Sequence, residues 1–450
     1  MSDMKNDKSH RGFASVSLLM LLAACLLVSG CAGPPEALEP LPVRGPRPGL
    51  GGDVVGPRLA TITAEPVVRV RVAGGVDGVV LRAGSRGGVV TVREPADEGS
   101  GGNAQRFQSP VTVSVRGGAF RIHDGAGRSG TWRATSLVFE ASGGLALDGA
   151  AYPGSMRLHL RGAGLDAVNH VPLEAYLPGV LEKELLPNWH PRAFEAQAIA
   201  ARSYALFEMA GRSASNYDVE STVRSQVYGG ASTNPRARSA VRATRGRVLA
   251  FDGRIVPAFF SSTTGGRGQD AAVAFPNVAD IPPLRGRDRG EWGSISPSWR
   301  WGPLRRELGT LSRRLARWGE ATGHEIAALN RIAAVAVTSR SRSGRPATFR
   351  VTDVSGRRYT LRCEAFRFAC NHAADGDAAR GLPAIPADQR LKSSDVTISS
   401  EGGAVVFRGR GYGHGVGMGQ WGAQHLATAG YDAGAILGFY YAAAAVMRLY

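Results

Sequence analysis

Beyond its first thirty residues, the 450-residue chain has no long apolar run. The late stretch of small apolar residues at 441–446 is too short to cross a bilayer as a helix. About 420 residues therefore remain for a globular body, which is enough for two or three domains with their own hydrophobic cores.

Cysteine is also scarce, with four in the whole chain, and two of these lie in or beside the N-terminal apolar run. The other two, Cys363 and Cys370, are seven residues apart. In an exported protein this pairing favours a disulfide over a metal site. His372 nearby would bring the set to only three ligands, so we predict a Cys363–Cys370 disulfide, no metal and no cofactor.

The apolar run at residues 13–28 follows a short basic region. This order, with small residues before a cut site, is typical of a secretory signal. Because Cys31 directly follows those small residues, we predict a lipoprotein signal peptide at residues 1–30 and lipid attachment at Cys31. A plain signal peptide or an uncleaved anchor are the alternatives. We expect an exported protein, lipid-anchored to the membrane and facing the periplasm or cell wall.

Acidic residues are in deficit, with 37 Asp and Glu against 54 Lys and Arg, which gives a net charge of +17. Such a balance favours anionic partners. Nucleic acid is not expected outside the cell, whereas anionic wall polymer and lipid head groups are found there. The alternative explanation is compositional, because arginine and glycine are abundant in proteins from GC-rich genomes.

Differences in composition and hydrophobic pattern divide the mature chain into three parts. Residues 31–59 are rich in proline and glycine and are predicted to form a tether. Residues 60–165 contain short alternating apolar segments between Gly and Asp clusters, which predicts a β-rich subdomain. Residues 166–450 mix helical and strand patterns. We therefore predict an α+β fold, in which a β-rich N-terminal part precedes a mixed helix and strand catalytic core with a groove.

The core begins with two expected helices. Apolar residues recur at intervals of three and four from Leu173 to Leu181, and Pro187 is expected to end this first helix. A second helix, dense in alanine, is expected at residues 191–209. An arginine-rich amphipathic helix is expected at residues 303–322.

Glu184 lies four residues after Val180 and seven after Leu177, and therefore on the apolar face of the first helix. Glu182, by contrast, should face water. Burial raises the pKa of a carboxyl, as a general acid working near neutral pH requires. The alternative is a buried glutamate that is paired with an arginine such as Arg202.

Three further stretches carry polar side chains that suit sugar binding. They are the second helix, the Ser- and Gly-containing segments between residues 217 and 266, and the glycine-rich segment at residues 409–423. Interhelical bonds and ordinary turns are the alternatives for the first two. The third lacks the βαβ context of a dinucleotide site, and its glycines would let backbone approach a ligand. The predicted substrate-binding residues are Gln197, Arg202, Tyr204, Gln226, Tyr228, Ser261, Ser262, Tyr412, His414 and Gln420.

In this order, these stretches resemble the stage II sporulation protein D (SpoIID) / LytB amidase-enhancer family. The resemblance is carried by Glu184 just before a helix-ending proline, by the Ala-Gln-Ala-Ile-Ala-Ala-Arg-Ser-Tyr-Ala segment from residue 196, and by the Gly-Tyr-Gly-His-Gly-Val-Gly-Met segment from residue 411. Tyr440, in a Tyr-Tyr segment near the C-terminus, joins the predicted substrate-binding residues.

The resemblance implies a peptidoglycan lytic transglycosylase that cleaves the bond between N-acetylmuramic acid and N-acetylglucosamine, preferably in strands stripped of stem peptides. By position, Glu184 would be its single catalytic acid and base. The expected partner is the glycan strand. The alternatives are a non-catalytic enhancer that binds an N-acetylmuramoyl-L-alanine amidase of the wall, and a structural glycan-binding lipoprotein.

Overall fold

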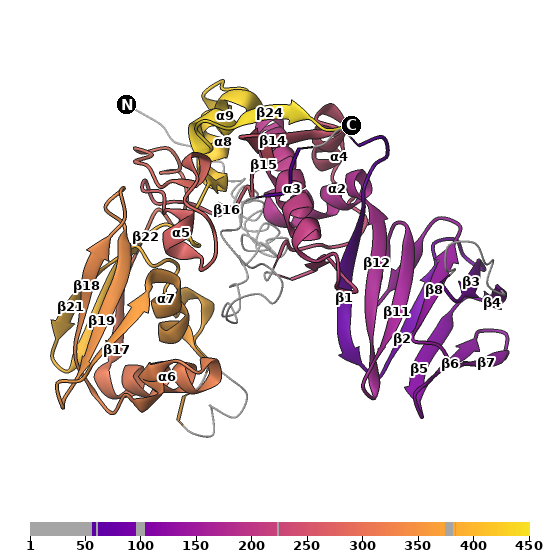
Figure 1. The fold of residues 1–450 in the computed structure, drawn as a ribbon, viewed down its shortest axis with the longest axis horizontal. Coiled ribbons are helices and arrows are strands. Elements are labelled where there is room, and N and C mark those ends of the chain that lie inside the picture. Colours follow the sequence, from indigo (N-terminus) through magenta and orange to yellow (C-terminus); the bar gives the residue numbers. More distant parts are fainter. Residues whose placement is uncertain (1–55, 60–61, 96–103, 223–224, 374–380, 383) are drawn as a thin grey trace, which may run out of the picture. The chain divides into compact units, whose positions relative to one another are not determined.

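The computed structural model describes residues 56–59, 62–95, 104–222, 225–373, 381–382 and 384–450. The predicted signal peptide and Cys31 lie outside these ranges, as does most of the predicted tether. The described residues group as one compact unit (Figure 1). Helices and strands both build this unit, so the predicted α+β class is confirmed.

The first part of the chain forms two sheets with one core between them, and their strand pairs are antiparallel except for the parallel pairing of β13 with β1. The larger sheet has the order β13-β1-β12-β11-β8-β3-β4. Its strands are β1 (Val67–Val76), β3 (Val89–Arg93), β4 (Gln105–Gln108), β8 (Ser136–Ala141), β11 (Ser155–Arg161), β12 (Gly164–Pro172) and β13 (Val219–Glu220). The boundary predicted at residue 165 falls within β12, and β13 joins this sheet from the later part of the chain.

The second sheet has the order β10-β9-β2-β5-β6-β7. Its strands are β2 (Gly78–Ala83), β5 (Val111–Arg116), β6 (Ala119–Asp124), β7 (Ser129–Trp132), β9 (Leu145–Leu147) and β10 (Ala150–Tyr152). Alternate residues of both sheets, among them Leu81, Val113, Ile122, Phe139 and Leu158, are fully buried in one cluster. This period of two follows from the strand pleat, in which successive side chains point to opposite faces.

Strand β12 leads without a break into the first helix of the core. It pairs with β1 in the register Val67↔Pro172, and α2 (Leu173–Glu184) starts at the next residue. The residues predicted for the apolar face of this helix, including Leu173, Leu177 and Val180, are fully buried. The last residue of α2 is therefore held relative to the sheet by a packed helix face.

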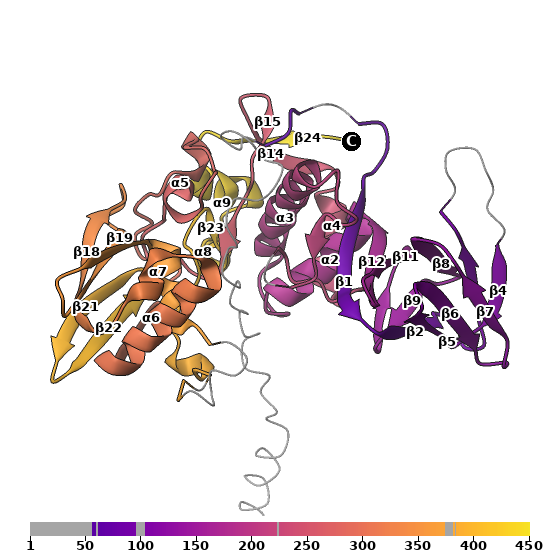
Figure 2. The same cartoon turned by 60° about the horizontal axis from the view of Figure 1, so that its bottom comes forward.

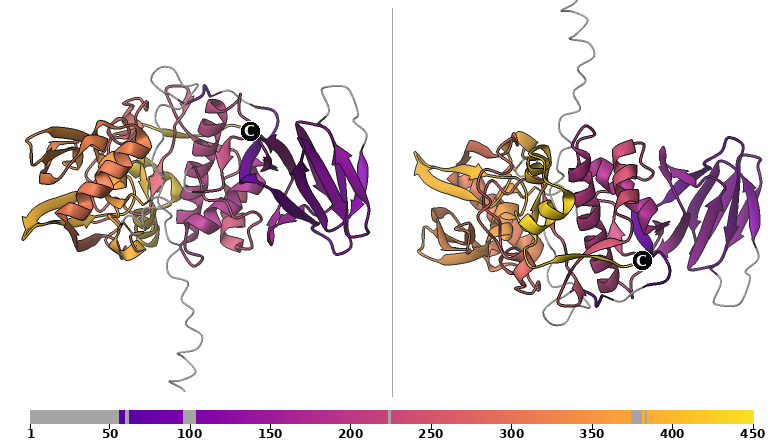
Figure 3. Two further views of the ribbon diagram at one scale, coloured as in Figure 1. Left: turned by 90° about the horizontal axis from the view of Figure 1, so that it is seen from below. Right: turned by 90° about the horizontal axis from the view of Figure 1, so that it is seen from above.

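Helix α3 (Pro191–Gly211) is central to the core and contacts α2, α4 (Pro235–Ala243), α8 (Gln420–Thr428), α9 (Ala433–Tyr440) and strand β14 (Figure 3). Its alanines at 196, 198, 200, 201 and 205 are completely buried. Small side chains permit this close packing on several faces. Proline at its first position needs no hydrogen-bond partner there, as the sequence suggested.

Two small sheets join distant parts of the chain beside α3. Strand β14 (Arg247–Phe251) pairs with β15 (Arg254–Ile255) and with β24 (Ala445–Arg448) near the C-terminus. Strand β16 (Phe260–Ser261) runs parallel to β23 (Met418–Gly419), and α5 (Ala271–Ala274) follows soon after β16. The β16–β23 pair brings two of the predicted site segments together.

The remaining region packs two helices with two three-stranded sheets (Figure 2). The first sheet contains β17 (Arg300–Glu307), β22 (Ala404–Arg410) and β21 (Val396–Glu401), and the second contains β18 (Ile332–Arg340), β19 (Pro346–Asp353) and β20 (Arg358–Arg362). The helices are α6 (Leu308–Thr322) and α7 (Cys363–Asn371), with short 3₁₀ turns at Pro282–Leu284, Glu325–Ala328 and Ala387–Gln389. The helix expected from residue 303 starts at Leu308, because residues 304–307 pair with β22.

Within the described ranges, the structure contains no helix that is both long enough and apolar enough to span a bilayer.

Candidate functional site

Glu184 ends helix α2, and its side chain is half-buried. Its carboxylate Oε2 accepts a 2.9 Å hydrogen bond from Nε2 of Gln420, and the backbone N–H of Val227 donates to it as well. Burial raises the pKa of Glu184 above its ordinary value, and the two hydrogen bonds offset this rise only in part. The sequence-based expectation of a desolvated carboxyl at this position therefore agrees with the geometry.

Residues 226–230 run along α2 and aim the N–H of Val227 at Glu184. A Cβ atom on Gly179 would lie 2.0 Å from the carbonyl oxygen of Gly230, so this approach of backbone to helix requires glycine. One turn further along, Gly229 packs against the aliphatic part of Lys183. The order of these contacts places Val227 beside the last residue of the helix.

Two buried side chains fix this segment on either side of Val227. Gln226 accepts a hydrogen bond from the Tyr176 hydroxyl at 3.1 Å and donates to the carbonyl of Ala201 at 3.3 Å. The Tyr228 hydroxyl donates to the Asn169 side chain at 3.1 Å. Both residues were predicted to bind substrate, but at 1% and 4% exposure they lie beneath the site and support it.

Gln420 is positioned by the turn from β23 into α8. The backbone N–H of Trp421 donates to the carbonyl of Ser262 at 3.0 Å, next to the parallel pairing of Ser261 with Gly419. One helical turn later, the side chain of Gln424 accepts a 2.8 Å hydrogen bond from the backbone N–H of His190. Helix α8 is thus tied both to β16 and to the α2–α3 connection, which holds Gln420 against Glu184.

The acidic residue in the first turn of α2 has a different environment from that of Glu184. Glu174, in the first turn, forms two hydrogen bonds of 2.8 Å with Arg202, whose side chain is completely buried. Arg202 also donates to the carbonyl of Arg247 at 2.9 Å. Arg202 therefore does not bind substrate, as was predicted, because its guanidinium is occupied inside the core. For the same reason, it is not the partner of Glu184.

Helix α3 also buries the other two residues that were predicted from its sequence. Gln197 has no exposed surface, and neither its amide oxygen nor its amide nitrogen has a hydrogen-bond partner. Tyr204 is 7% exposed and packs edge-on against Phe259. In this structure both side chains lie in the packed interior of the core.

The two loops that follow β16 and precede β23 lie side by side. Thr263 and Tyr412 form a β-bridge, and a Cβ on Gly413 would lie 2.8 Å from the Cβ of Ser261. Tyr412 is half-buried with Lys392 Nζ 6.0 Å from its ring centre, and Ser262 is half-buried as well. The predicted residues Ser261, Ser262 and Tyr412 therefore belong to one region, which Gln420 connects to Glu184.

Tyr440 lies behind that region. It is 1% exposed, and the guanidinium of Arg289 lies 5.0 Å from the centre of its ring. A Cβ atom on Gly422 would lie only 1.8 Å from its hydroxyl oxygen. Tyr440 thus packs under the start of α8 and requires glycine at position 422. It is placed to support Gln420 and not to touch a substrate.

His414 points to a different neighbourhood. Its ring lies 5.0 Å from that of Phe275 and 6.2 Å from that of Phe259, and its Nδ1 accepts a 3.0 Å hydrogen bond from the N–H of Val416. Burial lowers its pKa to about 4, against the opposing charge of Glu364. None of the contacts found among the described residues joins His414 to Glu184.

Cys363 and Cys370 are both free and buried, so the predicted disulfide is wrong. They occupy the first and eighth positions of α7, and seven residues of helix separate them by roughly 10 Å along the axis. The Cα atoms of a disulfide lie much closer than this. Sequence spacing alone did not reveal that one helix would contain both residues. Among the described residues, no group of His, Cys, Asp or Glu is arranged to hold a metal ion.

Sequence reasoning missed the backbone N–H of Val227 and the aromatic pair of Trp189 and Trp421. The two rings lie 5.0 Å apart at 69°, and they join the α2–α3 connection to the start of α8. A peptide N–H has no sequence signature, although Val227 is flanked by two residues that were predicted. Trp421 directly follows Gln420, so it was open to prediction.

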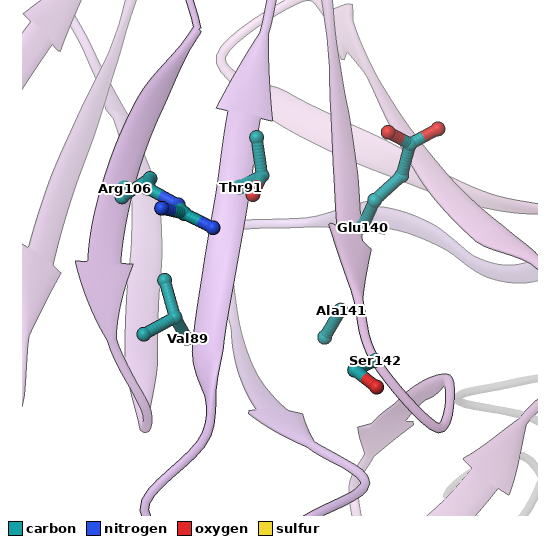
Figure 4. Close-up of a pocket in the computed structure, with 6 residues that line it drawn as sticks. All are labelled: Val89, Thr91, Arg106, Glu140, Ala141 and Ser142. Carbon is teal, nitrogen blue, oxygen red and sulfur yellow. The ribbon is translucent and has the colours of Figure 1, made fainter.

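Figure 4 shows a pocket far from this site in sequence, on strands β3, β4 and β8. Val89, Thr91, Arg106, Glu140, Ala141 and Ser142 line it. The side chains in view are those of an open sheet surface, and Glu140 there forms a surface ion pair with Arg93. This pocket lacks the desolvated acid that distinguishes the surroundings of Glu184.

Comparison with known sequences gives matches that include the segment around Glu184. The family profile described as SpoIID, Stage II sporulation protein, matches residues 161–251, which include α2, α3 and β14. An uncharacterised protein of Brachyspira hyodysenteriae is 28% identical over 311 residues, covering 68% of this chain and 74% of that protein.

Two named relatives extend this comparison. The stage II sporulation protein D of Bacillus amyloliquefaciens is 25% identical over 291 residues, covering 61% of this chain and 74% of the relative. The amidase enhancer of Bacillus subtilis is 27% identical over 286 residues, covering 59% of this chain but only 39% of that protein. The profile match and these named relatives support the SpoIID / LytB amidase-enhancer family as the family of this chain.

Proposed function

We propose that this protein is a peptidoglycan lytic transglycosylase that cleaves the β-1,4 bond between N-acetylmuramic acid and N-acetylglucosamine. The preferred substrate is a glycan strand stripped of its stem peptides. The observation that carries the proposal is the environment of Glu184, a half-buried carboxyl with a raised pKa that is held by an amide and a backbone N–H. A raised pKa increases the fraction of the carboxyl that is protonated at a given pH, as a general acid requires, and a half-buried side chain can still reach a substrate.

In this mechanism Glu184 acts twice. Its proton passes to the glycosidic oxygen as the bond from that oxygen to C1 of N-acetylmuramic acid breaks. The resulting carboxylate accepts the proton of the C6 hydroxyl on the same sugar, whose oxygen bonds to C1 and closes a 1,6-anhydro ring. The proton count on Glu184 returns to its starting value. Since the substrate supplies the nucleophile, the second carboxylate that glycoside hydrolases use is not required.

Gln420 and Val227 orient the carboxyl in both steps. Both donate hydrogen bonds to Glu184, and donors to a carboxylate favour its charged form. They therefore stabilise the anion that appears after the first proton transfer. They also keep the carboxyl from turning away from the sugar, which preserves the geometry that proton transfer needs.

The proposal includes the location of the protein. Export, followed by lipid attachment at Cys31, would bring the enzyme to the cell wall, where its substrate is found. The excess of basic residues that underlies the net charge of +17 would favour contact with anionic wall components there.

The test is a digest of denuded glycan strands with the wild type and with Glu184→Gln, analysed by mass spectrometry for 1,6-anhydro-muramoyl ends. We expect the variant to lose at least about 100-fold in rate while still binding glycan. Glu182→Gln is the matched control, because Glu182 lies on the same helix and bonds to Thr233 instead. A wild type that produces no anhydro ends would overturn the proposal.

A second candidate function rests on the relative named amidase enhancer. In this role, the protein would bind a wall N-acetylmuramoyl-L-alanine amidase and stimulate it without cutting glycan. The same variant separates the two functions, because an enhancer would keep its effect on the amidase after Glu184→Gln. Peptide release by the purified amidase, with and without each form of this protein, measures that effect.

A further inference from the structure

Three aromatic side chains form an open corner beside α8. The ring of Trp292 lies 4.9 Å from that of His425 at 69°, and 5.8 Å from that of Tyr431 at 81°. Both neighbours therefore stand nearly perpendicular to the indole. Tyr431 is 46% exposed, and Trp292 and His425 are half-buried, so the corner is open to solvent.

The corner is rigidly held. A Cβ on Gly422 would lie 3.3 Å from the carbonyl oxygen of Trp292, which shows how closely this segment packs on α8. The backbone N–H of Tyr431 donates to the carbonyl of Leu426 at 3.1 Å, which fixes the turn after the helix. An exposed aromatic group on a fixed backbone suits ligand binding, because little conformational entropy is lost on contact.

His425 adds a directed polar group. Its Nδ1 accepts a 3.3 Å hydrogen bond from the backbone N–H of Gly293. In the neutral imidazole the proton is therefore on Nε2, which remains as a donor. Apolar ring faces next to one fixed donor match a pyranose sugar, which has a face of C–H groups and a rim of hydroxyl and acetamido oxygens.

The corner is continuous with the candidate active site. Helix α8 begins at Gln420, which bonds to Glu184, and His425 lies roughly 7.5 Å further along the helix axis. Between them, Trp421 and Gln424 are half-buried on the same side of the helix, and Trp421 packs against Trp189. A linear glycan that leaves Glu184 along this side of α8 would next meet the corner.

We propose that Trp292, His425 and Tyr431 form a secondary saccharide subsite, which binds an N-acetylhexosamine of the strand away from the bond that is cut. This inference rests on the proposed function, and it predicts that the enzyme prefers long strands to short fragments. Tyr431 contributes ring surface, and His425 donates to a sugar oxygen.

The test measures binding separately from cleavage. In the full chain with Glu184→Gln, affinities for N-acetylglucosamine dimers, tetramers and hexamers are compared with and without Tyr431→Ala. We expect Tyr431→Ala to weaken hexamer binding roughly tenfold and to leave dimer binding unchanged. Tyr431→Phe keeps the ring and should restore hexamer affinity.

In the active enzyme, Tyr431→Ala should raise KM for denuded strands by a similar factor and leave kcat within about twofold. Equal hexamer affinity in Tyr431→Ala and its parent overturns the subsite, as does a protein that binds no oligosaccharide. These results are distinct from failure of the proposed function, which is the absence of anhydro ends from the wild type.

Discussion

The two ends of helix α2 place glutamates in opposite electrostatic settings. At the first turn, Glu174 pairs with the buried Arg202 and also accepts hydrogen bonds from Tyr450 and the backbone of Gly246. At the last turn, Glu184 has an amide and a backbone N–H as its partners. The pKa of Glu174 is lowered, mainly by Arg202 against the opposing effect of burial, whereas burial raises the pKa of Glu184.

The difference teaches that burial alone does not define a general acid. Both carboxyls are withdrawn from water, and what separates them is whether a cation is within reach. Glu174 is charged and stabilises the fold at neutral pH. Glu184 is costly to charge and therefore free to exchange a proton with a ligand. The same helix thus has a structural carboxylate at one end and, in the proposed function, a reactive one at the other.

Removing the guanidinium of Arg202 should have the largest effect on the contrast between Glu174 and Glu184. Arg202→Met leaves Glu174 buried without its partner, and we expect unfolding stability to fall by about 3–5 kcal/mol. Urea denaturation followed by far-UV circular dichroism measures this loss. Arg245→Met is the control, because Arg245 pairs with Glu65 at the surface, where solvent screens the pair and its loss should change stability far less. A loss below about 1 kcal/mol for Arg202→Met would contradict the structural role of this pair.

The pH dependence of that stability has a defined sign. Glu174 has a lowered pKa in the folded state, so its contribution is present at neutral pH and is lost as pH falls below the ordinary glutamate range. We therefore expect the stability difference between wild type and Arg202→Met to shrink in acid. If this stability difference grew in acid, groups other than Glu174 would dominate its pH dependence.

The sequence predicted that Glu184 would be withdrawn from water, but it did not predict the surroundings of that carboxyl. The spacing from Leu177 to Glu184 placed that carboxyl on a packed helix face, because helical periodicity is a local property. Arg202 was predicted to bind sugar and proved to be buried with Glu174, since the choice between two glutamates ten residues apart depends on how α2 packs on α3. The disulfide prediction was wrong for a similar reason. The spacing of Cys363 and Cys370 in sequence does not show that both lie in one helix, which keeps them apart.

Gln420 and His414 show the same limit within one motif. Both lie in the glycine-rich segment that resembles the family, and both were predicted as site residues. The structure directs Gln420 to Glu184 and His414 to Phe275. Glycine-rich backbone can take many paths, so the direction of each side chain there is set by tertiary contacts that the sequence does not encode locally.

Removing the Gln420 amide that bonds to Glu184 tests the same contrast at the other end of α2. Because the Gln420 hydrogen bond lowers the pKa of Glu184, Gln420→Leu should raise that pKa further. In the proposed mechanism the protonated form starts the reaction, so activity should fall as pH rises through this pKa, and in the variant this fall should occur at higher pH. The maximal rate should drop roughly tenfold, because the carboxyl is less well oriented.

The pH profile of kcat on denuded glycan tests this expectation. Gln424→Leu is the matched control, because it removes the same side chain one helical turn later, where it bonds to the backbone of His190. We expect its profile to keep the wild-type position. A falling limb that moves to lower pH in Gln420→Leu would mean that the amide does not stabilise the charged carboxylate.

The smallest expected effect is on the folding stability that the wild type loses by burying the Glu184 carboxyl. A carboxyl whose pKa is raised by folding binds more protons in the folded than in the unfolded state, so its contribution to stability declines as pH rises from the ordinary glutamate pKa through the folded value. Glu184→Gln removes this decline. The variant should therefore be more stable than the wild type by about 1 kcal/mol at neutral pH, with the gain vanishing in acid, as chemical denaturation at both pH values would measure. Since Glu182 has a lowered pKa, Glu182→Gln should yield no such gain, and equal gains from both substitutions would remove the distinction between a reactive and a structural carboxylate on which the comparison depends.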